Sequence, residues 1–475
     1  MPFYLHYMGA EAFGLVGFYI MIQAWMQLLD MGLTPVLSRS MSCLRAEKLG
    51  VSEALARLRV LEWILGSIAI LSVSLIWMTS DWIGQQWLSA PEIDHNTLNR
   101  SIALIGLAAA LRWLTGIYKG SLVGLEKQSW VNGISAVFTT LRFAGVIPLL
   151  VFFSTAPDYF FAFQATVTML ELLMFSVLVR RLLPHTHLSW KPDFRVFVAM
   201  LPMVGSMAFL SAMWIVVTQI DKLVLSSILP LKEYGYYTLA IMAANGVLMP
   251  VPPLSQVIQP RMTVLAEQAN EERLVELYRL TSQLAAIVFF GMGGGIAFFA
   301  EPLLRIWSGN DEIARAAAPI LFWYGLANAF VGVLVLPFML QFAKGRLRLH
   351  IIGTLIRLFT LVPALVFCAI RWGAVGAGQV FFFANLLFFL LWVPFMHHRF
   401  LSKVAWRWPF VDTMPICLGI LAWLALASQT LPESTAPLVM LIWIGVSVVI
   451  AAGLGITLGT RSRRYALEWI LTRIK

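Results

Sequence analysis

Residues 11–39 read EAFGLVGFYIMIQAWMQLLDMGLTPVLSR, and residues 233–261 read EYGYYTLAIMAANGVLMPVPPLSQVIQPR. Both stretches begin with a glutamate followed closely by an aromatic residue and a glycine. Both continue as an apolar run and end in proline and arginine, and each is followed by a charged segment and another apolar run. Two copies in the same direction are typical of two-lobed membrane transporters built around a central cavity.

The composition of the whole chain supports a membrane protein. Its 475 residues are 60% hydrophobic and 12% charged, with a mean hydropathy of +0.81. Apolar runs of about 20 residues recur throughout, and each is long enough to cross the hydrocarbon core as a helix. We therefore predict an all-α polytopic membrane protein with thirteen spans, near 12–37, 60–80, 101–118, 130–153, 160–179, 199–229, 235–257, 277–299, 314–337, 349–371, 376–396, 412–430 and 437–459.

The loops between these spans carry Lys and Arg almost entirely on one side. Of the 34 basic residues, 24 lie in the loops of that side and in the tail 460–475, whereas the other side holds Arg100, Lys232, Arg305 and Arg371. Basic loops stay in the cytoplasm. The pattern predicts a multi-pass protein of the cell inner membrane with a cytoplasmic C-terminus. The net charge of +10 is thus explained by topology, and we expect no nucleic-acid partner.

The repeat also predicts the domain organisation. A helix at 199–229 precedes the second copy, whereas the first copy starts about ten residues after Met1. We expect the first helix of the N-terminal lobe to be missing; the alternative is a genuine thirteen-helix protein. The predicted domains are an N-terminal lobe at 1–195, a C-terminal lobe at 196–400, and a helix pair with a basic tail at 401–475.

Features of enzymes are lacking in the sequence. No loop is long enough to form a catalytic domain, and there is no Walker A motif, HExxH motif, CxxC pair or nucleophile elbow. The three cysteines, Cys43, Cys368 and Cys417, are scattered and have no metal-ligand spacing. We expect no catalytic residues, metal or cofactor.

Three arginines lie deep within predicted spans, at Arg112, Arg142 and Arg357. Each has a polar residue three positions away, so the span carries a polar stripe. Lipid cannot solvate such stripes, so they should converge on a hydrated interior. Guanidinium groups pair well with diphosphate, and the arginines are therefore candidate substrate-binding residues of a cationic lumen.

Three acids are candidates for ion coupling: Glu171, Asp221 and Asp30. A partly desolvated carboxyl group can take up and release a proton during a transport cycle. The alternative is that these charges form structural ion pairs, such as Arg142 with Glu171 on neighbouring helices. Asp30 lies near the cytoplasmic end of its span, where capping or loop tethering is an alternative role.

Two motifs resemble a known family. The first is Met8–Gly17 with Leu29–Arg39, and the second is Asp221-Lys222 with Glu233–Ala240 and, later, Gln259-Pro260-Arg261. The chain is similar here to the polysaccharide transporter branch of the multidrug/oligosaccharidyl-lipid/polysaccharide exporter superfamily, and to the Wzx-type O-antigen flippases within it. The spacing of the apolar runs extends this resemblance over nearly the whole chain.

The resemblance implies two six-helix, MATE-like lobes plus an additional C-terminal helix pair. It implies a flippase that moves an undecaprenyl-diphosphate-linked O-antigen or other polysaccharide repeat unit to the outer leaflet through a cationic lumen, with ion-coupled antiport. The implied partners are the lipid-linked oligosaccharide, membrane lipids and polysaccharide assembly proteins, in lipopolysaccharide biosynthesis.

Two alternatives remain. A lipid II or multidrug exporter belongs to the same superfamily, although a drug exporter would favour acids over arginines in its cavity. A membrane-embedded polymerase or glycosyltransferase would need a large outer loop or a nucleotide-sugar domain, and the sequence has neither.

Overall fold

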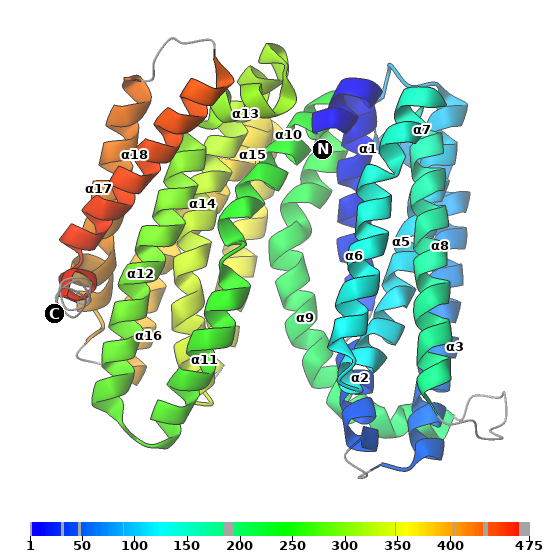
Figure 1. Cartoon of the computed structure of the whole chain (residues 1–475), viewed down its shortest axis with the longest axis horizontal. Coiled ribbons are helices and arrows are strands. Elements are labelled where there is room, and N and C mark those ends of the chain that lie inside the picture. Colours follow the sequence, from blue (N-terminus) through cyan, green and yellow to red (C-terminus); the bar gives the residue numbers. More distant parts are fainter. Residues whose placement is uncertain are drawn as a thin grey trace. The chain divides into compact units, whose positions relative to one another are not determined.

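The structure, a computed structural model, describes residues 2–29, 33–45, 49–88, 90–183, 194–346, 348–401, 404–430 and 436–464. The regular elements of this part of the chain are all helices (Figure 1). Ten helical segments within it are long and apolar enough to cross a membrane. Many large apolar side chains, such as Ile70, Leu71 and Met78, are exposed on them, as a lipid-facing surface requires. The predicted all-α polytopic fold is confirmed.

By its internal contacts the chain forms two compact units, which we call the first unit, Phe3–Gly235, and the second unit, from Tyr236 onward. The predicted C-terminal lobe begins at 196, whereas the contacts of α9 group it with the first unit. Contact units are not transport lobes, so the predicted division into lobes stays a prediction. The first unit contains α1 (Pro2–Leu29), α2 (Leu33–Arg45), α3 (Val51–Met78), α4 (Ser80–Trp82), the π-helix η1 (Ile83–Trp87), α5 (His95–Gly124), α6 (Gln128–Ala144), α7 (Val146–Phe152), α8 (Pro157–Leu182) and α9 (Phe194–Ile228).

Helix α5 is the centre of the first unit, because α2, α3, α6 and α8 all pack against it. Asp94 caps its first turn by accepting hydrogen bonds from the backbone N–H groups of Asn96 and Thr97, at 3.1 and 3.3 Å. Asp94 thereby satisfies two of the donors that the start of a helix leaves without partners.

Three glycines four residues apart let α2 approach α5 closely. A Cβ atom at Gly120 would lie 2.7 Å from Cγ2 of Thr34, and one at Gly124 would collide with the carbonyl oxygen of Ser38. Gly116 faces the same Thr34 side chain. Small residues at this spacing allow the close helix contacts that are typical of membrane bundles.

We expect Gly120→Leu to destabilise the first unit by about 1–3 kcal/mol, because the larger side chain overpacks the contact with Thr34. The matched control is Gly133→Leu on α6, where an added Cβ meets nothing within 4 Å. The measurement is thermal unfolding of both variants in detergent. Equal unfolding temperatures would show that the α2–α5 contact tolerates a large side chain.

The second unit is organised around α12 and α14, which pack against each other. α11, α13 and α15 pack against α14, and α17 and α18 pack against α12. The elements are α10 (Leu231–Asn245, which begins in the first unit), the 3-10 helix η2 (Gly246–Leu248), α11 (Val251–Glu267), α12 (Glu271–Phe298), α13 (Ala300–Ser308), α14 (Asp311–Ala343), α15 (Arg348–Leu387), the π-helices η3 (Phe388–Trp392) and η5 (Trp408–Thr413), α16 (Val393–Phe400), α17 (Met414–Gln429) and α18 (Pro437–Leu458).

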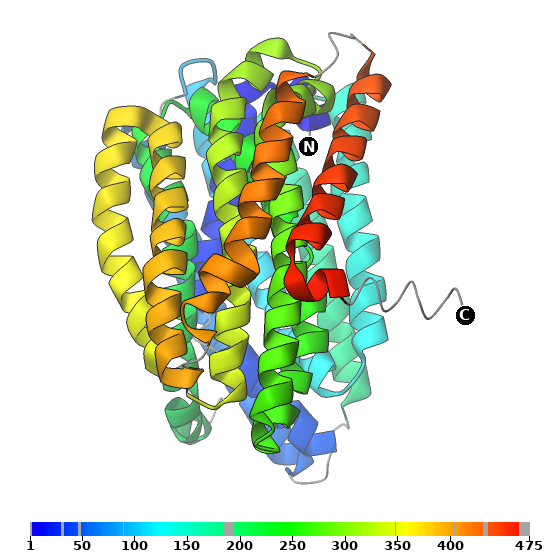
Figure 2. The ribbon, with the colours of Figure 1, turned by 90° about the vertical axis from the view of Figure 1, so that its left-hand side faces the viewer.

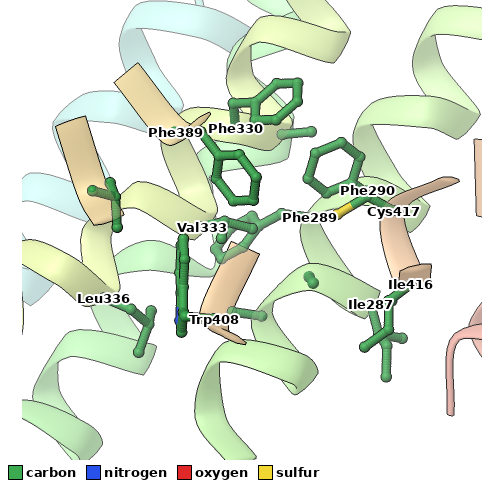
Figure 3. Close-up of a cluster of buried hydrophobic side chains, with 14 of the residues drawn as sticks. Ile287, Phe289, Phe290, Phe330, Val333, Leu336, Phe389, Trp408, Ile416 and Cys417 are labelled. Carbon is green, nitrogen blue, oxygen red and sulfur yellow. The ribbon is translucent and has the colours of Figure 1, made fainter. Parts of the chain in front are cut away.

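Aromatic rings form much of the core of the second unit (Figure 3). Phe290 of α12 lies edge-on to Phe330 of α14, with centroids 4.9 Å apart. Phe330 contacts Phe389, and Phe389 contacts the fully buried Trp408, at 5.4 and 5.1 Å. These contacts join the segment that leads into α17 to the central helices of the unit.

Several span boundaries differ from the sequence-based prediction. The first span begins at Pro2 and ends at Leu29, and α2 starts a separate helix at Leu33. The predicted spans 349–371 and 376–396 are mostly the two arms of α15, which reverses at Gly373 (Figure 2). Gly373 has φ 59°, a left-handed conformation that glycine adopts without a steric cost.

Candidate functional site

Glu171 of α8 is the centre of a buried charge cluster in the first unit. Its carboxylate accepts a hydrogen bond from the Arg142 guanidinium of α6 at 2.5 Å and one from the Lys119 ammonium of α5 at 2.7 Å. The side chains of Arg142 and Glu171 are 4% and 3% exposed, whereas Lys119 is 33% exposed. We call these three residues the Glu171 cluster.

The polar stripe of α8 positions Glu171 toward this cluster. Gln164, Thr168 and Glu171 follow one another at helical spacing, and all three are buried. Thr168 receives a 3.4 Å hydrogen bond from Arg142, and the Gln164 amide donates one of the same length to the Arg142 carbonyl oxygen. The stripe is therefore buried within the first unit. Whether it faces a hydrated lumen stays a prediction. The ion pair between Arg142 and Glu171, one of the two sequence-based alternatives, is also present.

Arg112 of α5 lies beside the cluster without an ion pair to it. Its side chain is exposed, and its guanidinium is within electrostatic range of Arg142 and close to the Tyr19 hydroxyl of α1. Arg142 retains a buried Nε–H without a hydrogen-bond partner among the described residues. Together with the cluster, Arg112 gives three cations against one carboxylate. The region is therefore positively charged and can accept a further anion.

The remaining candidate residues lie on other helices or outside the described part of the chain. Asp221, on α9, is 4% exposed and within electrostatic range of Tyr234. Arg357 belongs to the second unit, where its guanidinium lies over the Phe381 ring at 5.6 Å. Whether Arg357 shares a lumen with Arg112 and Arg142 stays a prediction. Asp30 lies outside the residues that the structure describes.

Sequence reasoning missed Lys119 as a partner of Glu171. It placed Lys119 at the start of a loop, whereas α5 continues to Gly124 and holds this side chain against α8. The usable signal was its position seven residues after Arg112, on the same helical stripe.

A second buried ion pair, also missed, lies in the second unit. Arg279 of α12 donates two hydrogen bonds to Asp412, both at 2.7 Å, and Asp412 is fully buried. The Gln283 amide donates to the same carboxylate at 3.1 Å, and its oxygen accepts from the backbone N–H groups of Arg461 and Ser462 at 2.9 and 3.0 Å. We call Arg279, Gln283 and Asp412 the Asp412 latch, because they fasten the C-terminal helix pair to α12.

Comparisons with known proteins agree with this architecture. A model of the family described as polysaccharide biosynthesis protein matches residues 1–266. Comparison with curated proteins finds no matching sequence.

Two solved structures share the fold. A lipid II flippase MurJ in an inward closed conformation is 14% identical, with a TM-score of 0.70 and 96% of each chain covered. An inward-facing multidrug resistance MATE family transporter of the MOP superfamily is also 14% identical, with a TM-score of 0.67, covering 84% of this chain and 93% of that one.

Proposed function

The chain belongs to the polysaccharide biosynthesis protein family, and from this premise we propose that it is a flippase for a lipid-linked oligosaccharide. The proposed substrate is an undecaprenyl-diphosphate-linked O-antigen or other polysaccharide repeat unit. It would cross the cell inner membrane by alternating access, with no chemical step catalysed by the protein. The observation that carries the proposal is the excess of positive charge formed by Arg112, Arg142 and Lys119 around the single carboxylate of Glu171.

The geometry supports a division of roles among these side chains. Arg112 is exposed and offers paired N–H donors to a diphosphate, a contact that a guanidinium makes at any physiological pH. Arg142 and Lys119 are hydrogen-bonded to Glu171. Their charges would strengthen the positive field at Arg112 without contacting the substrate themselves. Because Glu171 holds both cations, its protonation would release them toward a bound anion. Substrate binding and proton binding would then influence each other.

We also propose an orientation of the chain in the membrane, further roles for charged residues, and the partners that would receive the substrate. The basic loops and the C-terminus would lie in the cytoplasm, where the oligosaccharide is attached to its lipid carrier. Arg357 would add a further cation to the lumen, and Asp221 and Asp30 would join Glu171 as ion-coupling acids. Proteins that assemble the polysaccharide would receive the flipped substrate.

Reconstitution into lipid vesicles tests the function directly. A fluorescent undecaprenyl-diphosphate oligosaccharide should become fully accessible to a membrane-impermeant quencher in vesicles that contain the protein. In protein-free vesicles about half should stay protected, because headgroups do not cross a bilayer unaided. Movement of lipid II alone would favour a lipid II exporter, and movement of neither lipid would contradict the proposal.

We expect Arg112→Gln to reduce the initial flipping rate at least about tenfold, because it removes a charged donor worth roughly 1.5–3 kcal/mol in contact with an anion. Arg112 is exposed, so the unfolding temperature should change little. Arg315→Gln on α14 replaces another exposed arginine and is the matched control. A normal rate in Arg112→Gln would remove this residue from the substrate path.

A further inference from the structure

A cavity of about 310 Å³ lies on the face of the first unit formed by α3, α5 and α8. Helices α3 and α8 both pack against α5. Helix α5 contributes Tyr118 to the lining of the cavity. The cavity is separate from the Glu171 cluster, because it shares none of the cluster's residues. Its lining consists of Arg59, Glu62, Trp63, Gly66, Ser67, Ile70, Tyr118 and Arg180.

One end of the cavity carries two arginines, Arg59 and Arg180. Glu62 accepts a 2.8 Å hydrogen bond from the Tyr118 hydroxyl and a 3.4 Å bond from the Arg180 guanidinium. The Arg180 side chain is nevertheless 62% exposed, so part of its guanidinium is accessible from outside. Guanidinium groups pair well with phosphate oxygens, because their planar fork donates two N–H bonds at once.

The other end of the cavity is apolar and extends along α3. Trp63 and Ile70 are 49% and 71% exposed, and a Cβ atom added at Gly66 would meet nothing within 4 Å. Arg59 and Ile70 are eleven positions apart, which is a rise of about 16 Å along a helix. This length is about half of the roughly 30 Å hydrocarbon core, which is the depth of one leaflet.

The position of Arg59 places the charged end at the membrane boundary. The first turns of α3 contain Glu53, Arg57 and Arg59, and the residues from Val60 to Met78 include a single charged side chain, Glu62. Arginine and tryptophan at such a boundary are the side chains that contact lipid headgroups. A lipid could therefore place its phosphate at Arg59 and Arg180 and an acyl chain beside Gly66 and Ile70.

A second cavity of about 470 Å³ between α6 and α8 provides the contrast. It is lined by apolar and small residues without any charged side chain, namely Ser129, Trp130, Gly133, Ile134, Val137, Phe138 and Met174. It has room for an acyl chain but no cation in its lining to bind a phosphate.

We propose that the cavity of α3, α5 and α8 is a binding site for one anionic phospholipid of the leaflet that faces the basic loops. Arg59 and Arg180 bind the phosphodiester, Tyr118 and Glu62 hold Arg180 in position, and the surface from Trp63 to Ile70 takes an acyl chain. The site is independent of the proposed transport function, because none of its residues belongs to the Glu171 cluster.

Native mass spectrometry of the purified protein tests the site. The protein is released from detergent micelles that contain equal amounts of phosphatidylglycerol and phosphatidylcholine, and the bound lipids are counted. We expect one phosphatidylglycerol to be retained in preference to phosphatidylcholine. The double variant Arg59→Gln/Arg180→Gln should weaken this binding about 25-fold, because each basic side chain near the surface contributes about fivefold.

Filling the cavity gives the second arm of the experiment. Gly66→Leu introduces a side chain into open space, so the protein should fold and the lipid should be lost. Gly133→Leu, in the uncharged cavity, also meets open space and should leave phosphatidylglycerol bound. Inorganic phosphate at millimolar concentration should not displace the lipid.

Three outcomes would overturn the proposal. The first is equal retention of phosphatidylcholine, and the second is undiminished phosphatidylglycerol binding in both Gly66→Leu and the double arginine variant. The third is displacement of the lipid by inorganic phosphate, which would indicate a site for the free anion.

Discussion

Replacing the buried pair with Arg142→Met and Glu171→Leu together is expected to stop flipping while the protein remains folded. Both side chains are almost fully buried, and well-packed apolar residues often replace such a pair without loss of stability. Lys119 loses its partner, but it is 33% exposed, and its long side chain can reach water. The double variant thus removes the cluster's function without leaving an unpaired charge in the interior.

The single variants should behave differently. Glu171→Ala leaves the buried Arg142 guanidinium without its carboxylate, a change that costs about 3–5 kcal/mol of stability. The comparison needs two measurements, the flipping rate in vesicles and the unfolding temperature in detergent. Flipping at the normal rate in the double variant would assign Arg142 and Glu171 a purely structural role.

The second large effect concerns the Asp412 latch. Asp412→Ala is expected to destabilise the second unit by about 3–5 kcal/mol, because Arg279, only 16% exposed, loses both of its hydrogen bonds to the carboxylate. Gln283 loses one of its acceptors as well. Thermal unfolding in detergent measures the loss of stability. If α17 and α18 detach, limited proteolysis should cut the variant faster than the unchanged protein in the segment that follows residue 404.

Arg305→Ala is the control for the latch variant. Arg305 forms ion pairs with Glu301 and Asp311 at 2.8 and 2.7 Å, but all three side chains are more than 40% exposed. Exposed pairs contribute at most about 1 kcal/mol, because water and salt screen them. If Asp412→Ala unfolded at the same temperature as Arg305→Ala, the buried carboxylate would not be what holds the helix pair.

Hydropathy predicted the helices well, since crossing lipid imposes one dominant requirement on composition. The orientation inferred from loop charge stays a prediction. Polar spacing also identified Arg142 and Glu171 as interior residues, because Thr168 and Gln164 marked the buried stripe of α8. These patterns are local, and a single helix determines each of them.

Pairings between distant helices could not be predicted in the same way. Arg279 and Asp412 are 133 residues apart, and no periodicity within α12 or η5 indicates which partner each will find. The spacing of Gly116, Gly120 and Gly124 is typical of a helix contact. Only the structure shows that α2 is the helix that packs against them. Partner choice depends on three-dimensional packing, which the order of residues along one helix does not contain.

The Asp412 latch also has a consequence for biogenesis. A ribosome adds about 5–20 residues per second, so roughly 7–27 seconds separate the synthesis of Arg279 from that of Asp412. Throughout that interval the nascent α12 holds a cation that has not yet met its carboxylate. The Arg279–Asp412 pair can form only after Asp412 has been synthesised, and the packing of α17 and α18 against α12 is therefore a late step in the assembly of the second unit.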